Sequence, residues 1–187
     1  MPETRFLMFR VLHIFGASIP NPTDMKQLYI TRHGKSSWDY SDIADIDRPL
    51  NARGIRNSYS MAERLLRQGA RPDIIVSSPA TRALSTAVIF MRVLKLPAGI
   101  LRIDENIYDG DLGDLTRIIT STGPEYSCLM LFGHNPAFTV LANRFLVESV
   151  DNIPTAGIVS LTFEAENWQD LERTAPEKET FDYPKRG

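Results

Sequence analysis

The sequence predicts an α/β protein, a three-layer α/β/α sandwich with a mostly parallel central sheet. Strand-like and helix-like segments alternate from Met25 onward, which is typical of parallel strands joined by crossover helices. Residues 128–132 form a continuous apolar run, as expected for a strand that is covered on both sheet faces. The chain has 187 residues, which is long enough for one domain with its own core.

The first half of the chain supplies two strand–helix units. Residues 28–31 are predicted to form a short strand, and residues 51–68 carry apolar side chains near helical spacing. Gly69 follows that helix directly, where it can act as a C-terminal stop. A second strand is predicted over residues 73–78, between two prolines, and a second helix over residues 81–94.

The second half continues the alternation. We expect a strand over residues 100–103 and a short helix over residues 112–120. The apolar run described above is the next strand, and Pro136 stands where the following helix, residues 137–147, would begin. Residues 157–163 contain Val and Thr and close the series as a strand.

The two ends of the chain are predicted to lie outside the core. Residues 1–24 contain a short apolar run that His13 interrupts, and prolines follow it. We expect a dispensable N-terminal extension, with a cleaved signal segment as the alternative, and one domain over residues 25–187. Residues 167–187 are charged and contain proline, so we expect them to lie on the surface or to fray.

Composition excludes several classes of protein. Lys plus Arg number 21 and Asp plus Glu 23, so the net charge of -2 gives no overall signature of nucleic-acid binding. No stretch approaches the roughly 18 apolar residues of a membrane span. The single cysteine, Cys128, excludes an intrachain disulfide and fits the cytoplasm. We therefore expect a cytoplasmic protein that binds neither nucleic acid nor membrane, and the sequence leaves its oligomeric state open.

Polar side chains follow three of the predicted strands. Arg32 and His33 come directly after the first strand, and Arg82 lies one helical turn beyond the second. His134 follows the apolar run of residues 128–132. Because ligands bind beyond the carboxyl ends of the strands in open α/β sheets, we expect these four side chains to converge at one edge.

Two arginines and two histidines suit phosphoryl transfer. Arginine forks match phosphoryl oxygens and keep their charge at any working pH, and a neutral histidine can attack phosphorus. Neighbouring cations lower the pKa of a histidine, so Arg32 and Arg82 would favour the neutral, attacking form of His33. No Asp/Glu cluster stands in these loops to hold Mg²⁺. We therefore expect neither a metal nor another cofactor.

Three motifs now stand in order along the chain: Arg32-His33-Gly34, then Ser77-Ser78-Pro79 with Arg82, then Gly133-His134-Asn135-Pro136. Together they resemble the histidine phosphatase (phosphoglycerate-mutase-like) superfamily. The residues around the first motif, and Asp47-Arg48-Pro49-Leu50-Asn51 with Arg53-Gly54, are similar to small SixA-type phosphohistidine phosphatases. The resemblance covers about residues 25–163, and several motifs in the right order make it specific.

The resemblance implies roles for individual residues. His33 matches the histidine that attacks phosphorus and becomes transiently phosphorylated. Arg32 and Arg82 match the pair that binds phosphate oxygens, and His134 matches the second histidine, which donates to the phosphoryl group. The same comparison adds Ser36 and Arg48 to the substrate-binding residues.

Glu105 resembles the acid that protonates the leaving group in the mutases, although SixA-type members do not all keep this acid. Asp104 and Asp109 are the alternatives, and Tyr108 is interpreted as a core or rim residue. Imidazole leaving from phosphohistidine, particularly when protonated, is a good leaving group and reduces the need for an acid.

Spacing within the family predicts the class of substrate. Only 29 positions (134 − 105) separate Glu105 from His134, whereas the mutases insert a long helical cap there. The site should therefore be open, so that a phosphohistidine on a partner protein could reach it. Choice among substrates would come from rim residues, which include Lys35, Trp38, Arg48 and Arg53.

We therefore predict a metal-independent phosphatase that forms a phosphohistidine enzyme intermediate and acts on phosphohistidine in a partner protein. Two alternatives remain open at this point. One is a phosphatase for small phosphate esters, and the other is a module that binds phosphorylated partners without turnover.

Overall fold

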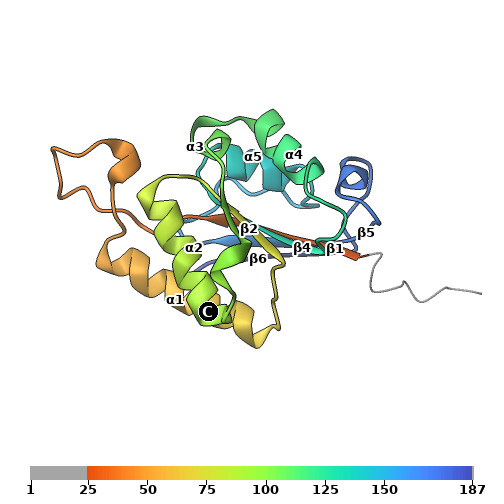
Figure 1. The fold of residues 1–187 in the computed structure, drawn as a ribbon, viewed down its shortest axis with the longest axis horizontal. Helices are drawn as coiled ribbons and strands as arrows, with labels where there is room; N and C mark the ends of the chain where they lie inside the picture. Colours follow the sequence, from red (N-terminus) through yellow and green to blue (C-terminus); the bar gives the residue numbers. More distant parts are fainter. Residues whose placement is uncertain (1–24, 187) are drawn as a thin grey trace, which may run out of the picture.

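The computed structural model describes residues 25–186, which fold around one sheet of six strands in the order β3-β2-β4-β1-β5-β6 (Figure 1). The strands are β1 (Met25–Arg32), β2 (Ile74–Ser77), β3 (Leu101–Ile103), β4 (Cys128–Gly133), β5 (Ile158–Glu164) and β6 (Lys178–Asp182). β1, β2, β3 and β4 are parallel, whereas β5 runs antiparallel to both β1 and β6. The predicted α/β class and the mostly parallel sheet are confirmed.

Helices cover both faces of this sheet (Figure 1). α1 (Ala52–Arg67) and α2 (Thr81–Leu94) lie on one face, and α3 (Asn106–Asp109), α4 (Leu112–Thr120) and α5 (Ala137–Asn143) lie on the other. Three short 3-10 turns complete the elements: η2 (Asp45–Asp47), η3 (Ala98–Ile100) and η4 (Trp168–Glu172). None of the helices within residues 25–186 has the length and apolar character needed to cross a membrane.

The ends of the helices follow from local sequence. The Asn51 side chain accepts a hydrogen bond from the Gly54 amide at 2.8 Å and so caps the first turn of α1. Gly69, just past the other end, adopts φ +80, a left-handed conformation that glycine reaches without strain. At α4, Asp111 and Asp114 form a capping box.

Each central strand divides its side chains between two apolar layers. On β4, Leu129 and Leu131 belong to the core shared with α3, α4 and α5. The alternate residues, Met130 and Phe132, belong to the core shared with α1 and α2. Because successive side chains of a strand point to opposite faces, a strand covered on both faces must be apolar throughout. This explains the continuous run that the sequence shows.

The C-terminal segment corrects one expectation. Instead of lying on the surface or fraying, residues after Asn167 form η4 and the edge strand β6. Trp168 is 0% exposed, and its indole nitrogen donates to the Tyr126 carbonyl at 2.8 Å. β6 is an edge strand with a largely polar sequence, so it lacks the repeated apolar residues that would predict a strand. The predicted N-terminal extension, residues 1–24, lies outside the described residues.

Candidate active site

Strand register brings the two histidines of the motifs together. Arg32, at the end of β1, pairs with Gly133 at the end of β4. His33 and His134 are the next residues along these adjacent parallel strands, and their ring centroids lie 4.9 Å apart. The convergence expected at the carboxyl edge of the sheet is therefore present in the fold.

His33 has the tautomer that a nucleophile needs. Its Nδ1 lies 2.6 Å from the Gly34 carbonyl oxygen, and a carbonyl can only accept, so Nδ1 carries the hydrogen. The neutral ring then keeps a free electron pair on Nε2. Burial lowers the pKa of His33 to about 4, helped by the charges of Arg82, Arg32 and Arg48, although the Gly34 hydrogen bond opposes this shift. His33 is therefore neutral at pH 7.

His134 is also buried and neutral. Burial, followed by the proximity of His33 and Arg82, lowers its pKa to about 3. Its Nε2 lies 2.8 Å from the Ser78 hydroxyl, which itself accepts a hydrogen bond from the Ala80 amide. The Ser78 hydroxyl can donate to Nε2 or accept from it, and a donor role for Ser78 puts the ring proton on Nδ1. That buried nitrogen has no partner among the described residues, so it can donate to a phosphoryl oxygen.

Arg32 is anchored from one side only. Its Nη1 donates to the Ile153 carbonyl at 2.6 Å and to Asn152 Oδ1 at 3.1 Å. Asn135, from the motif after β4, donates to the same two oxygens and so holds this turn in place. Arg32 Nε is buried with no partner within residues 25–186. The guanidinium therefore keeps donor capacity for an anion.

Arg82 is oriented by a residue that the sequence analysis missed. Asp45, in η2, accepts from Arg82 Nη1 through its backbone oxygen at 2.5 Å and from Nη2 through Oδ2 at 2.8 Å. Its carboxylate also accepts from Arg48 at 2.7 Å and from the Tyr108 hydroxyl at 2.8 Å. Burial raises the pKa of Asp45, but hydrogen bonds from Tyr108, Arg82 and Arg48 outweigh burial and lower it to about 2. The only sequence signal was an acid three positions before Arg48.

The predicted binding residues Ser36 and Arg48 contact each other. Arg48 Nη2 donates to Ser36 Oγ at 2.7 Å, and the Arg48 guanidinium carbon lies 3.2 Å from the centroid of the Trp38 ring. These residues form one wall of a pocket of about 210 Å³. Its lining comprises Arg32, His33, Lys35, Ser36, Trp38, Arg48, Arg82 and Thr155. Arg53, the remaining rim residue expected from the sequence, is exposed and does not line this pocket.

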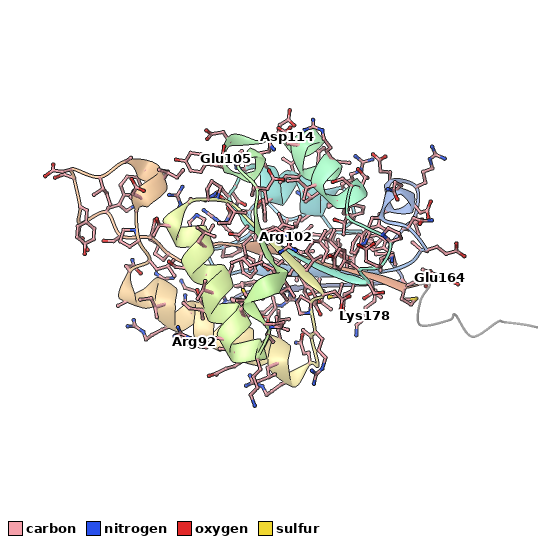
Figure 2. The ribbon with its side chains drawn as sticks, in the orientation of Figure 1. Arg92, Arg102, Glu105, Asp114, Glu164 and Lys178 are labelled. Carbon is pink, nitrogen blue, oxygen red and sulfur yellow. The ribbon has the colours of Figure 1, made fainter. Side chains whose placement is uncertain are left out.

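The acid predicted from the segment before α4, Glu105, is not among the residues that line this pocket. Glu105 is exposed at the start of α3, and Figure 2 labels it there. Its carbonyl accepts from the Tyr108 amide at 3.0 Å, but within residues 25–186 its side chain has no hydrogen bond or ion pair with the site residues. Tyr108, one helical turn later, contacts Asp45, and its ring packs edge-on against His134 with centroids 5.6 Å apart. The role of Glu105 stays a prediction, while Tyr108 is a site residue that the sequence placed at the core or rim.

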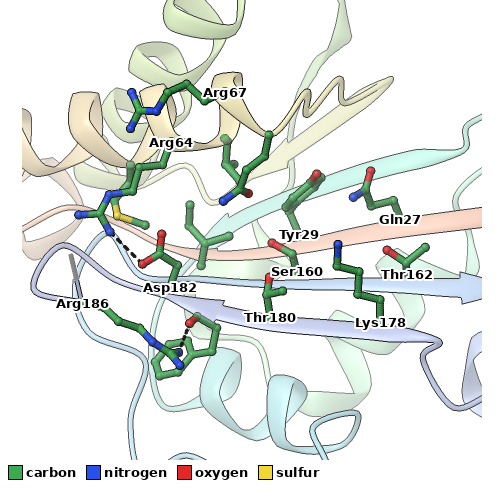
Figure 3. A pocket seen from close by; sticks show the side chains of 15 residues that line it. Gln27, Tyr29, Arg64, Arg67, Ser160, Thr162, Lys178, Thr180, Asp182 and Arg186 are labelled. Atoms are coloured by element: carbon green, nitrogen blue, oxygen red, sulfur yellow. Dashed lines mark hydrogen bonds and ion pairs between the residues drawn. The ribbon is translucent and has the colours of Figure 1, made fainter.

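A larger hollow of about 740 Å³ lies elsewhere, where β1, β5 and β6 pass beside α1 (Figure 3). It carries Arg64 paired with Asp182 at 2.9 Å, together with strand residues such as Ser160 and Thr180, but no histidine. We place the site at the smaller pocket because it combines His33 with Arg32 and Arg82, whereas the larger hollow contains no histidine.

The charge of this pocket suits an anion rather than a cation. Its lining contains three arginines and a lysine and no carboxylate. Within residues 25–186 no group of three or more His, Cys, Asp or Glu side chains could hold a metal ion. A phosphoryl group matches this arrangement, because its oxygens can accept hydrogen bonds from the arginines and its phosphorus can be attacked by His33.

Comparison with known proteins places this site in a family. An uncharacterized chloroplastic protein of Arabidopsis thaliana is 28% identical over 169 residues, which cover 86% of this chain and 77% of that protein. An uncharacterized protein of Mycobacterium tuberculosis is 31% identical over 151 residues, covering 75% of this chain and 91% of its own. The fold is similar to that of the protein histidine phosphatase SixA complexed with tungstate, with a TM-score of 0.71, 24% identity, and coverage of 84% and 97%. The model of the histidine phosphatase superfamily (branch 1) matches residues 28–126, and the chain belongs to this superfamily.

Proposed function

We propose that this protein is a metal-independent phosphatase that removes phosphate from phosphohistidine on a partner protein. One observation carries the proposal: His33 presents a neutral ring with its Nδ1 proton held by Gly34, in a pocket shared with Arg32 and Arg82. Membership of the histidine phosphatase superfamily supports phosphatase activity. We further propose the cytoplasm as the site of action, in keeping with a single cysteine.

The first step transfers the phosphoryl group to the enzyme. His33 Nε2 donates its electron pair to phosphorus, and the bond between phosphorus and the substrate imidazole breaks in line with this attack. The substrate imidazole leaves with the electron pair of that bond and takes up a proton. Arg32, Arg82 and the His134 Nδ1 hydrogen stabilise the charge on the phosphoryl oxygens as it spreads.

The second step regenerates the enzyme. A water oxygen attacks the phosphorus, the bond to His33 Nε2 breaks, and inorganic phosphate leaves. The displaced nitrogen recovers its electron pair, and the Gly34 carbonyl still holds the Nδ1 proton. We assign the proton transfers that poor leaving groups require to Glu105, because alkoxides need protonation far more than imidazole does.

The open surroundings of the pocket support the proposed class of substrate. Between Glu105 and His134 the chain forms only α3, α4 and β4, so no long helical cap stands over His33. α3 has 4 residues and α4 has 9. This arrangement supports a phosphorylated side chain on a protein surface as the substrate.

The test compares two substrates with one control enzyme. Release of inorganic phosphate is measured from a protein phosphorylated on histidine and from para-nitrophenyl phosphate, with His33→Ala as the control. We expect faster turnover of the phosphohistidine protein, none with His33→Ala, and an acid-labile phosphoryl group on trapped wild-type enzyme. Much faster ester cleavage would assign the protein to small esters, and binding without release would make it a phosphoprotein-binding module.

A further inference from the structure

The connection between β1 and α1 carries three large side chains in solvent. Trp38 is 74% exposed, Tyr40 57% and Ile43 38%. Figure 1 shows this connection, in orange, extending away from the sheet and beyond the ends of the helices. We call residues 38–43 the 38–43 loop. Exposed apolar residues are common singly, but a group on one projecting loop marks an interaction surface.

The base of this loop is fixed beside the active site. The Ser37 amide donates to the Pro49 carbonyl at 2.9 Å, and Arg48 Nε donates to the Ser37 carbonyl at 3.0 Å. Ser36 and Leu50 form an isolated antiparallel bridge just below. The two ends of the loop are thus hydrogen-bonded to each other at the pocket wall, and the loop projects from this base.

Trp38 links the loop to the phosphate-binding residues. Its ring stacks on Arg48, and both residues line the pocket that contains His33. Any surface that covers Trp38 must therefore lie at the mouth of this pocket.

The size of the pocket requires most of a protein substrate to remain outside. Its volume of about 210 Å³ is below the roughly 300–1,000 Å³ of pockets that enclose a small molecule. It can hold a phosphoryl group and part of an imidazole. Because a histidine side chain is short, the protein surface around the phosphohistidine must come against the rim, where the 38–43 loop projects.

The charges on the loop indicate the chemistry of that surface. Asp39 and Asp42 lie on the loop, Asp47 follows it in η2, and all three are exposed. Carboxylates at these positions oppose approach to an anionic lipid surface. They complement a protein surface on which lysine or arginine surrounds an apolar patch.

We propose that Trp38, Tyr40 and Ile43 form the docking surface for the phosphohistidine-bearing partner, which presents an apolar patch with basic neighbours. The proposal rests on the proposed function and names the contact that selects its protein substrate. Tryptophan and tyrosine are the residues that most often dominate binding at protein interfaces.

The test separates docking from chemistry by changing the size of the substrate. The double variant Tyr40→Ser, Ile43→Ser leaves every residue of the pocket lining in place. We measure kcat/KM for N-phosphoimidazole and for a small folded protein phosphorylated at a histidine that lies among apolar and basic residues. We expect kcat/KM for the protein to fall about tenfold through KM, as for loss of an interface contact, and N-phosphoimidazole to change less than about twofold.

Val147→Ser provides the matched control. Val147 is 89% exposed and lies beside Glu179 of β6, outside the pocket lining. This variant should keep wild-type kcat/KM on both substrates. Equal loss on both substrates, or no loss on the protein, in the double variant would overturn the docking surface. Sedimentation with anionic lipid vesicles that depends on Tyr40 and Ile43 would overturn it in favour of a membrane contact.

Failure of the proposed function gives a different result. Wild-type enzyme that releases phosphate from neither N-phosphoimidazole nor the phosphorylated protein would contradict the phosphohistidine reaction itself. Wild-type enzyme that cleaves both, with a ratio that the double variant leaves unchanged, would contradict only the docking surface.

Discussion

Asp45 holds Arg82 at two points, with its backbone oxygen 2.5 Å from Nη1 and its carboxylate 2.8 Å from Nη2. Asp45, 37 positions away in the sequence, therefore orients both terminal nitrogens of Arg82, which we expect to bind phosphate. The same carboxylate joins Arg48 and Tyr108, so it connects the rim of the pocket to α2 and α3.

Replacement of Asp45 by asparagine should weaken anion binding. The amide keeps the size of the side chain but removes the charge that orients Arg82 and Arg48. Hydrogen bonds to charged groups contribute about 1.5–3 kcal/mol, so we expect the inhibition constant of inorganic phosphate to rise about tenfold or more. Asp42→Asn is the control, because Asp42 is exposed and its side chain accepts from Ser41 rather than from an arginine. Tighter phosphate binding in Asp45→Asn would instead mean that the carboxylate competes with the substrate.

The buried tryptophan of the C-terminal segment should be essential for stability. Trp168 is fully buried, and its loss leaves a cavity and removes one hydrogen bond to the Tyr126 carbonyl, which keeps the one from Lys26 Nζ at 3.1 Å. We expect Trp168→Ala to lower the free energy of unfolding by about 3–5 kcal/mol in urea denaturation. Trp38→Ala is a matched control, because its exposed ring stacks only on Arg48. That variant should lose about 1 kcal/mol or less. Equal effects of the two substitutions would contradict the packing of the segment after Asn167.

The two active-site histidines should make the protein less stable in mild acid. Their pKa values in the fold, about 4 for His33 and about 3 for His134, lie below the 6.5 of a free side chain. Between about pH 6.5 and 4 the unfolded chain therefore binds more protons, so the free energy of unfolding falls as the pH is lowered. The slope should approach at most about 1.4 kcal/mol per pH unit for each histidine.

Urea denaturation of the substrate-free protein at a series of pH values measures this slope. In the double variant His33→Asn, His134→Asn the contribution of both rings is absent. A variant that keeps the wild-type slope would show that the pH dependence arises from other groups.

Glu105 should matter only for poor leaving groups. Glu105→Gln removes the acid without changing the size of the side chain, and general acid catalysis typically contributes about 10²–10⁴-fold. We expect a large loss of kcat on an alkyl phosphate and less than about threefold loss on N-phosphoimidazole. Glu63→Gln serves as the control for loss of a surface charge, because Glu63 is exposed on α1 and does not line the pocket. Equal losses on both substrates would contradict this division of roles, and no loss on either would remove Glu105 from the mechanism.

The sequence was most informative where a buried strand ends. Apolar runs located β1 and β4, and the polar residues that follow them, Arg32, His33 and His134, could be placed at one edge because parallel strands align their carboxyl ends. The sequence does not indicate a role for Asp45, because its contact with Arg82 depends on the path of the long connection between β1 and α1, which the local sequence pattern does not specify.

Two other differences also have causes that the local sequence does not specify. Glu105 and Tyr108 lie within one helical turn, so the choice of which side chain meets His134 depends on the rotation of α3. β6 has three charged residues, Thr180 and a single apolar residue, Phe181, because a strand on the edge of the sheet needs little apolar cover. Both depend on tertiary placement rather than on residue type.

The pairing of Arg32 with Gly133 on β1 and β4 has a consequence for protein engineering. Backbone ladders, rather than flexible connections, set the spacing of the reactive imidazoles, so a shift of one position in either ladder would turn them away from each other. Insertions between the strands leave that spacing intact. Attempts to give this scaffold new specificities should therefore diversify the 38–43 loop and keep the ladder residues, Asp45 and Arg48 constant.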